Sequence, residues 1–296
     1  MSELHHSVNN PEAIIEAFDG LGYVTDEELA TILFLVLRMR KPLLLEGNPG
    51  VGKTEVANIL ADFLQTDLIR LQCYEGLDVN AAVYEWNYQK QLLSIKIQER
   101  EEKSAKETED YIFGEDFLLK RPLLQSITAK DKAPVLLIDE IDRADEEFEA
   151  FLLELLSAFQ ISIPEMGTIK ANHRPYVILT SNRTRELSDA LKRRCLYHWV
   201  HYPDAEKEQL IVQKHLPDID QQLAVRLVKV VNQLRKRKLD KSPGIAETLD
   251  WAQGLLALGF DDLTVESLET SLGCVLKSAD DIQRIRQEGL DALLTE

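Results

Sequence analysis

The feature that most constrains this fold is a glycine-rich loop between a short apolar run and a helical pattern. Residues 42–46 read Pro-Leu-Leu-Leu-Glu, which is typical of a buried strand, and helical spacing resumes from Thr54 to Leu64. The loop between them fits the pattern Gly-x-x-x-x-Gly-Lys-Thr and consists of Gly47, Asn48, Pro49, Gly50, Val51, Gly52, Lys53 and Thr54. A strand that turns through such a loop into a helix predicts an α/β fold and a phosphate-binding site.

Each residue type of this loop suits the chemistry of a nucleotide. Glycines let successive backbone N–H groups converge on phosphate oxygens, and the following helix presents its positive end to them. Lys53 is predicted to add a charge at the β and γ phosphates, and the Thr54 hydroxyl to bind the Mg²⁺ that bridges them. A chance glycine-rich turn is the alternative, but strand, loop, lysine, hydroxyl and helix all agree. We therefore expect ATP and Mg²⁺ as cofactors.

Two carboxylates follow a second apolar run. Residues 135–138 read Val-Leu-Leu-Ile and end in Asp139 and Glu140. Ligands of open α/β sheets bind at the carboxyl ends of the strands, so these side chains are placed for function. Asp139 is predicted to hold Mg²⁺ through its water shell, and Glu140 to orient and polarise the attacking water. A water-activating carboxylate favours hydrolysis over transfer of phosphate to a small molecule.

Polar residues at two later positions complete the candidate site. The apolar run 176–181 leads into Asn182, whose amide both donates and accepts and is predicted to contact the water near the γ-phosphate. A simple turn residue is the alternative there. Arg193 and Arg194 precede the last predicted strand, where an arginine could reach the γ-phosphate of a neighbouring subunit. Spacing alone does not separate that role from a surface ion pair.

The alternation of strands and helices predicts an α/β domain with a five-stranded parallel sheet. A β-hairpin is expected at 161–169, and the charged segment Gln98 to Asp110 reads as a solvated or mobile insertion. Strand signals stop after Tyr202-Pro203-Asp204. We expect an α/β nucleotide-binding domain over 1–203, with an N-terminal helical segment, and a small all-α domain over 204–296. The five strands are predicted at 42–46, 68–72, 135–139, 177–181 and 196–201.

The net charge and the cysteine content limit which partners and which cellular compartment are expected. A net charge of −17 over 296 residues disfavours non-specific attraction to nucleic acid or an anionic membrane surface. The run 235–238 (Arg-Lys-Arg-Lys) is either a local basic patch or a solvated helix face. Cys73, Cys195 and Cys274 lack paired spacing, which favours a reducing compartment, and no stretch is long and apolar enough to span a membrane. We expect the protein to be cytoplasmic and to bind no nucleic acid.

Taken together, these motifs resemble a known superfamily. The loop, Asp139–Glu140, Asn182 and Arg193–Arg194 resemble the Walker A, Walker B, sensor 1 and arginine-finger series of AAA+ ATPases, and the resemblance points to Arg194 first and Arg193 second as the finger. Residues 136–144 (Leu-Leu-Ile-Asp-Glu-Ile-Asp-Arg-Ala) are similar to the MoxR group. Membership of that group implies an insertion in the second helix, a hairpin before sensor 1 and a small helical lid. Residues 84–97 are in the right place for the insertion.

Three further segments resemble the CoxD-like branch of the MoxR group, which is associated with maturation of a carbon monoxide dehydrogenase metal centre. They are 70–78 (Arg-Leu-Gln-Cys-Tyr-Glu-Gly-Leu-Asp), 84–88 (Tyr-Glu-Trp-Asn-Tyr) and 181–187 (Ser-Asn-Arg-Thr-Arg-Glu-Leu). This resemblance implies a chaperone that forms a homo-oligomeric, hexameric ring. It further implies a von Willebrand factor A-type partner protein and a metalloenzyme client.

The chain departs from that pattern at one place. Relatives carry a Ser-Pro-Arg-like element that presents a sensor 2 arginine, whereas residues 242–245 read Ser-Pro-Gly-Ile. Arg235 or Lys241 stays open as a substitute. Two other functions also stay open: a DNA-linked AAA+ motor or loader, and a nucleotide-gated partner-binding switch with little turnover.

Overall fold

The computed structural model of the chain describes residues 9–98 and 105–295. The chain divides into two compact units. One unit combines the residues up to Ala30, the segment Gly47–Glu55 and the residues from Trp199 onward, and the other combines Thr31–Glu46 with Val56–His198. The predicted boundary between residues 203 and 204 stays a prediction.

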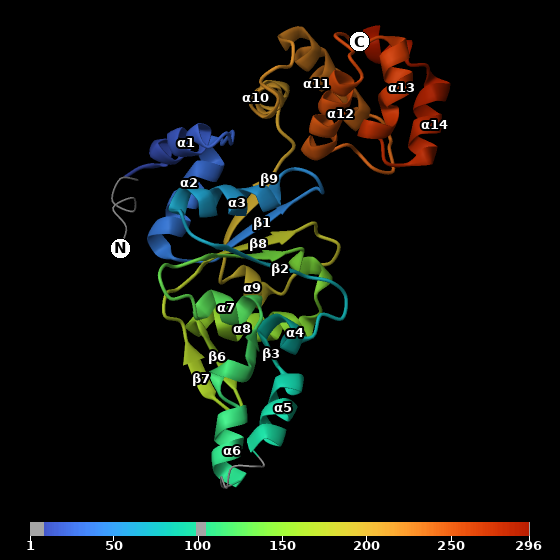
Figure 1. Ribbon diagram of the computed structural model, residues 1–296. Helices are drawn as coiled ribbons and strands as arrows, with labels where there is room; N and C mark the ends of the chain where they lie inside the picture. The colour runs from blue at the N-terminus through green and yellow to red at the C-terminus, as the bar shows by residue number, and fades with distance from the viewer. Residues whose placement is uncertain (1–8, 99–104, 296) are drawn as a thin grey trace. The chain divides into compact units, whose positions relative to one another are not determined.

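The central sheet has the five strands predicted from the sequence. They are β1 (Leu43–Gly47), β2 (Leu68–Gln72), β5 (Val135–Asp139), β8 (Tyr176–Ser181) and β9 (Leu196–Val200), in the order β2-β5-β8-β1-β9 (Figure 1). The pairs β2–β5, β5–β8 and β1–β8 are parallel. Every residue of β1, β5 and β8 is buried, which explains why these strands read as unbroken apolar runs.

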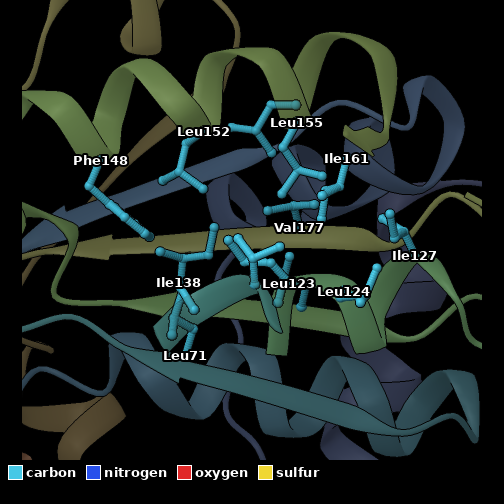
Figure 2. Packing of buried hydrophobic residues seen from close by; sticks show 14 of the residues in the cluster. Leu71, Leu123, Leu124, Ile127, Ile138, Phe148, Leu152, Leu155, Ile161 and Val177 are labelled. Atoms are coloured by element: carbon cyan, nitrogen blue, oxygen red, sulfur yellow. The ribbon is translucent and has the colours of Figure 1, made fainter. Parts of the chain in front are cut away.

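Helices pack on this sheet through apolar side chains. α3 (Lys53–Leu64) matches the helical pattern predicted from Thr54 to Leu64, and α2 (Glu27–Met39) precedes β1. α7 (Pro122–Ile127) and α8 (Glu146–Ala158) contribute to a core on the strands. Figure 2 shows α8 side chains pointing toward the strands and α7 side chains. The labelled core residues are Leu71, Leu123, Leu124, Ile127, Ile138, Phe148, Leu152, Leu155, Ile161 and Val177.

The insertion between β2 and β5 is more ordered than its sequence suggests. It contains α4 (Val79–Val83), β3 (Tyr84–Trp86), α5 (Tyr88–Gln98), α6 (Ala105–Ile112), η2 (Glu115–Phe117) and β4 (Leu118–Lys120), with β3 antiparallel to β4. Residues 105–110 are helical and not an irregular mobile segment, although Glu107 is exposed, as a solvated segment predicts. Residues 99–104 lie outside the described residues. Gln91 of α5 donates to the carbonyl of Ile112 over 2.8 Å, which ties the two helices together.

The predicted hairpin is present as β6 (Gln160–Ile163) and β7 (Gly167–Lys170), which pair antiparallel.

The aromatic residues of the insertion divide between two environments. Trp86 is buried and packs edge-on against Phe113, whereas Tyr88 at the start of α5 is exposed. These aromatic positions therefore do not form a single face.

The C-terminal region is helical throughout, as predicted (Figure 1). Its core surrounds Trp251, which is fully buried and donates from Nε1 to Ser271 Oγ over 2.7 Å. In the described residues no helix is both long and apolar enough to cross a membrane. The helices of this unit are α1 (Pro11–Gly20), α10 (Ala205–His215), α11 (Gln221–Lys236), α12 (Ile245–Ala257), α13 (Val265–Val275), α14 (Ala279–Glu288) and α15 (Asp291–Thr295).

Candidate functional site

The phosphate loop, residues 47–54, needs its glycines for two different reasons. Gly50 and Gly52 have φ angles of 77° and 91°, in the left-handed region that other residues rarely adopt. At Gly47 the constraint is space, because a Cβ there would lie 2.4 Å from the carbonyl oxygen of Val200 in β9. The loop therefore has a main-chain path that few other sequences can follow.

Lys53 begins α3, so its charge lies where the loop becomes a helix. Its side chain is buried, and Nζ donates to the carbonyl oxygens of Gly47 over 2.8 Å and Asn48 over 2.7 Å. Thr54 is the next residue of the same helix. An ammonium group, a curled glycine loop and the N-terminus of a helix form a donor set that fits the phosphates of a nucleotide.

The acidic edge consists of Asp139, Glu140 and Asp142, at and just beyond the end of β5. Asp139 is 3% exposed, and its two carboxylate oxygens have different partners. Oδ1 accepts from Thr180 Oγ1 of β8 over 2.5 Å, and Oδ2 accepts from Arg70 Nη2 of β2 over 2.5 Å. The predicted metal-binding carboxylate is thus held by side chains from both neighbouring strands.

Glu140 adopts an unusual backbone conformation. Its φ and ψ are 55° and 49°, the left-handed region that non-glycine residues seldom occupy, and it precedes η3 (Ile141–Arg143). Its N–H donates to Thr180 Oγ1 over 2.9 Å, and its carboxylate pairs with Arg143 Nε over 2.8 Å. Such strained positions persist where surrounding contacts fix them, and they cluster at functional sites.

Asn182 lies beside Glu140, and its predicted contact with the water near the γ-phosphate stays a prediction. Asn182 Nδ2 donates to Glu140 Oε1 over 3.4 Å, and its backbone N–H donates to Asp142 Oδ2 over 3.2 Å. Asp142 is buried and also accepts from the backbone N–H and hydroxyl of Thr184. Asp142 therefore fixes the turn that carries Asn182, a role the sequence did not reveal.

A buried glutamate at the end of β1 is a second residue that sequence reasoning missed. Glu46 is 5% exposed, and it accepts from Ser181 Oγ over 3.3 Å and from the hydroxyl of Tyr197 over 3.1 Å. Burial raises the pKa of Tyr197, and the nearby Glu46 carboxylate raises it further. The sequence does mark Glu46, because it is the one charged residue at the end of the apolar run 42–46.

The two candidate arginine fingers are exposed near the end of α9 (Asp189–Lys192). Arg194 Nη1 donates to the carbonyl oxygen of Ala190 over 3.0 Å, within its own segment. A role for Arg193 or Arg194 toward a second subunit stays a prediction.

The basic run does not form an open patch at Arg235. The guanidinium of Arg235 pairs with Glu208 over 2.6 Å, and the two side chains are 8% and 0% exposed. Arg235 also lies over the ring of Tyr202, and Arg237 pairs with Glu288. Arg235 is therefore part of the helical core, so neither interpretation of the run describes it.

The described carboxylates provide no complete metal cage. Within residues 9–98 and 105–295 there is no group of three or more His, Cys, Asp or Glu side chains arranged to hold a metal ion. Mg²⁺ is commonly bound by one or two protein oxygens together with substrate phosphates and water. The carboxylate of Asp139 is an oxygen ligand of this type, and the roles of Thr54 and Asp139 as metal ligands stay predictions.

Comparisons with known proteins agree with this fold. Residues 42–195, more than half of the chain, match the sequence profile described as "AAA domain (dynein-related subfamily)". Two uncharacterized proteins of Staphylococcus epidermidis are each 25% identical over 264 residues, covering 87% of this chain and 91% of the relative. The structure of a RuvB mutant from Thermotoga maritima aligns with a TM-score of 0.50 and 20% identity, covering 92% of this chain and 81% of that chain. This likeness shows a shared AAA+ P-loop fold.

Proposed function

Because the chain belongs to the dynein-related subfamily of AAA domains, we propose that it binds ATP with Mg²⁺ at the phosphate loop and hydrolyses it. The observation that best supports this proposal is the conformation of Glu140. Its backbone is held in the left-handed region by Thr180, and its carboxylate contacts Asn182. A glutamate fixed beside an amide in this way suits the activation of a water molecule.

Each predicted residue receives one role. The amides of the loop and Lys53 bind the phosphates, while Thr54 and Asp139 hold Mg²⁺, which stabilises the charge developing on the phosphate oxygens. Glu140 accepts the proton of the attacking water, and Asn182 orients that water. Arg70 and Arg143 balance the carboxylates of Asp139 and Glu140 in the structure described here.

The test is phosphate release by purified protein with ATP and Mg²⁺, comparing wild type with Glu140→Gln. Removing a general base lowers turnover by about 100-fold to 10,000-fold, while nucleotide affinity is expected to stay the same. Glu147→Gln is the matched control, because Glu147 is exposed in the first turn of α8. Unchanged phosphate release in Glu140→Gln would remove Glu140 from this role.

We also propose that the subunits form a hexameric ring in which Arg194, or failing that Arg193, acts on the nucleotide of its neighbour. Exposure of both side chains supports this, because a finger must reach outside its own subunit. Loss of such an arginine lowers turnover by about 10³-fold to 10⁵-fold. Mixing Arg194→Ala with Glu140→Gln subunits should restore some hydrolysis, because intact pairs form at some interfaces. Mixed rings with no activity at any ratio would contradict action between subunits.

For the cellular role we propose a MoxR-type, CoxD-like chaperone that remodels a metalloenzyme of the carbon monoxide dehydrogenase kind with a von Willebrand factor A-type partner. The support is the sequence of residues 70–78, 84–88 and 181–187. Glu140→Gln is expected to retain ATP and therefore to capture partners, so affinity purification with and without ATP tests this role. Recovery of neither protein class from a host that encodes both would contradict it.

The same experiments separate the competing functions. A nucleotide-gated switch predicts nucleotide binding with negligible wild-type turnover, and the Gly at position 244 is the feature that favours it. A DNA-linked motor predicts DNA affinity that falls steeply with salt. Because Arg235 is buried, less of the basic run 235–238 is exposed to bind DNA.

A further inference from the structure

The phosphate loop packs directly on the residue that precedes α12. A Cβ on Gly244 would lie 2.6 Å from the carbonyl oxygen of Gly50, 2.7 Å from its Cα and 2.8 Å from its carbonyl carbon. Real Cβ atoms do not approach main-chain atoms this closely. Gly244 has a φ of −89°, which any residue can adopt, so close approach rather than backbone conformation requires glycine here.

A hydrogen bond joins the same two segments. The backbone N–H of Ile245 donates to the carbonyl oxygen of Gly50 over 2.8 Å. Ile245 is the first residue of α12, where backbone N–H groups have no partner within the helix. Glu247 completes the end of the helix by accepting from the N–H of Gly244 over 2.9 Å. The start of α12 is thus bonded both to itself and to the loop.

This helix start is anchored in the core of the helical region. Arg235 Nε donates to the carbonyl oxygen of Pro243 over 2.8 Å, and its other nitrogens bind the buried carboxylate of Glu208. Thr248 of α12 donates to the same carboxylate over 2.8 Å. Arg235 is fully engaged in this network, so it is not a mobile substitute for an arginine at position 244.

We propose that Gly244 and Ile245 are positioning residues, which hold the phosphate loop through main-chain contacts in the conformation that accepts a nucleotide. This inference rests on the proposed nucleotide binding. A loop whose carbonyl is already held loses less conformational freedom when phosphates bind, and this raises affinity without any new contact to the ligand. The helical region therefore acts on the nucleotide through Gly50. An arginine at position 244 does not fit, because its Cβ would overlap the main chain of Gly50.

Ile245→Pro tests the hydrogen bond with little other damage. Proline lacks the N–H but is favoured at the first position of a helix. The preceding Gly244, with φ −89° and ψ −171°, already has the extended conformation that a following proline requires. Ile245→Ala is the matched control, because it also removes the isoleucine side chain but keeps the N–H.

We expect Ile245→Pro to bind a fluorescent ADP analogue about threefold to tenfold more weakly than Ile245→Ala, the effect of one lost hydrogen bond. Without nucleotide, the amide hydrogens of residues 48 and 50–52 should exchange faster in Ile245→Pro than in Ile245→Ala. Equal affinity and equal loop exchange in the two variants would overturn the inference. If the wild type binds no nucleotide, the proposed function fails instead, and the exchange measurement still reports on the loop.

Gly244→Arg gives a second, independent test. We expect it to weaken binding of the ADP analogue, because its Cβ displaces the loop. Gly273→Arg on α13 is the control, since a Cβ there meets nothing within 4 Å. Tighter nucleotide binding by Gly244→Arg would show that an arginine fits, and would overturn the steric argument.

Discussion

The phosphate loop and the acidic edge hold their conformations by different means. In the loop every contact involves the main chain: Gly47 packs on Val200 and Gly50 packs on Gly244, while the Lys53 side chain binds loop carbonyl oxygens. In the acidic edge, side chains from β2, β5 and β8 make them, through ion pairs and a shared hydroxyl. A site built by the main chain is defined by a contiguous motif, whereas one built by side chains depends on residues far apart in the sequence.

Gly47→Ala should have the largest effect, because a Cβ would overlap the main chain of Val200, which cannot rotate away. We expect the free energy of unfolding to fall by about 3 kcal/mol, as for an overpacked core position. Urea denaturation measures this, with Gly273→Ala as the control because a Cβ there has open space. Equal stability of the two variants would mean that the loop is not held by main-chain packing.

Thr180→Val probes the acidic edge in the corresponding way. The Thr180 hydroxyl is buried, donates to Asp139 and accepts from the N–H of Glu140. Valine has nearly the same shape but removes both hydrogen bonds, so we expect a loss of about 2 kcal/mol in the free energy of unfolding. Thr180→Ser keeps the hydroxyl and should recover most of that loss. If serine and valine destabilise equally, packing rather than the hydroxyl holds the edge.

The difference between the regions also explains what the sequence could predict. The loop and the strands were predictable because contiguous residues determine them, and β2 and β5 match their predicted bounds. Arg70 and Thr180 were not predicted as partners of Asp139, because their proximity depends on strand register, with Gln72 opposite Asp139 and Leu179 opposite Ile138. A single sequence does not specify that register. The helical order of α6 was missed for a related reason, since it depends on packing against α5.

Cys73 reports the negative charge that distinguishes the acidic edge. Its pKa is raised from 9.0 to about 12, first by burial and then by the carboxylates of Asp139, Asp142 and Glu140. The folded state therefore keeps its proton where the unfolded state loses it. The free energy of unfolding is therefore unaffected by the thiol below pH 9 and falls as the pH rises from 9 to about 12. At pH 10 the loss is about 1 kcal/mol.

Urea denaturation at pH 8 and pH 10 tests this, comparing wild type with Cys73→Ala. The variant should lose less stability on going to pH 10, whatever its stability at pH 8. An identical pH dependence would show that the thiol does not experience the charge of the edge.

The smallest effect is expected for Arg70→Gln. Arg70 pairs with one oxygen of Asp139, the predicted metal-binding carboxylate, but the Arg70 side chain is 53% exposed, so the ion pair is weak. Removing it should tighten Mn²⁺ binding, in the presence of ADP, by about twofold to fivefold. Electron paramagnetic resonance of Mn²⁺ measures this. Arg121→Gln is the control, because the Arg121 side chain is exposed to a similar degree and pairs with a different carboxylate, that of Glu85. Unchanged affinity would mean that Arg70 does not compete with the metal.

The contact between Gly50 and Gly244 also limits how this protein can evolve. A Cβ on Gly50 would lie 3.0 Å from the Cα of Gly244, and a Cβ on Gly244 would overlap three main-chain atoms of Gly50. No single substitution at either position leaves the other undisturbed. A descendant that acquires an arginine at position 244 must first relocate the start of α12, so we expect the two glycines to be inherited as a pair.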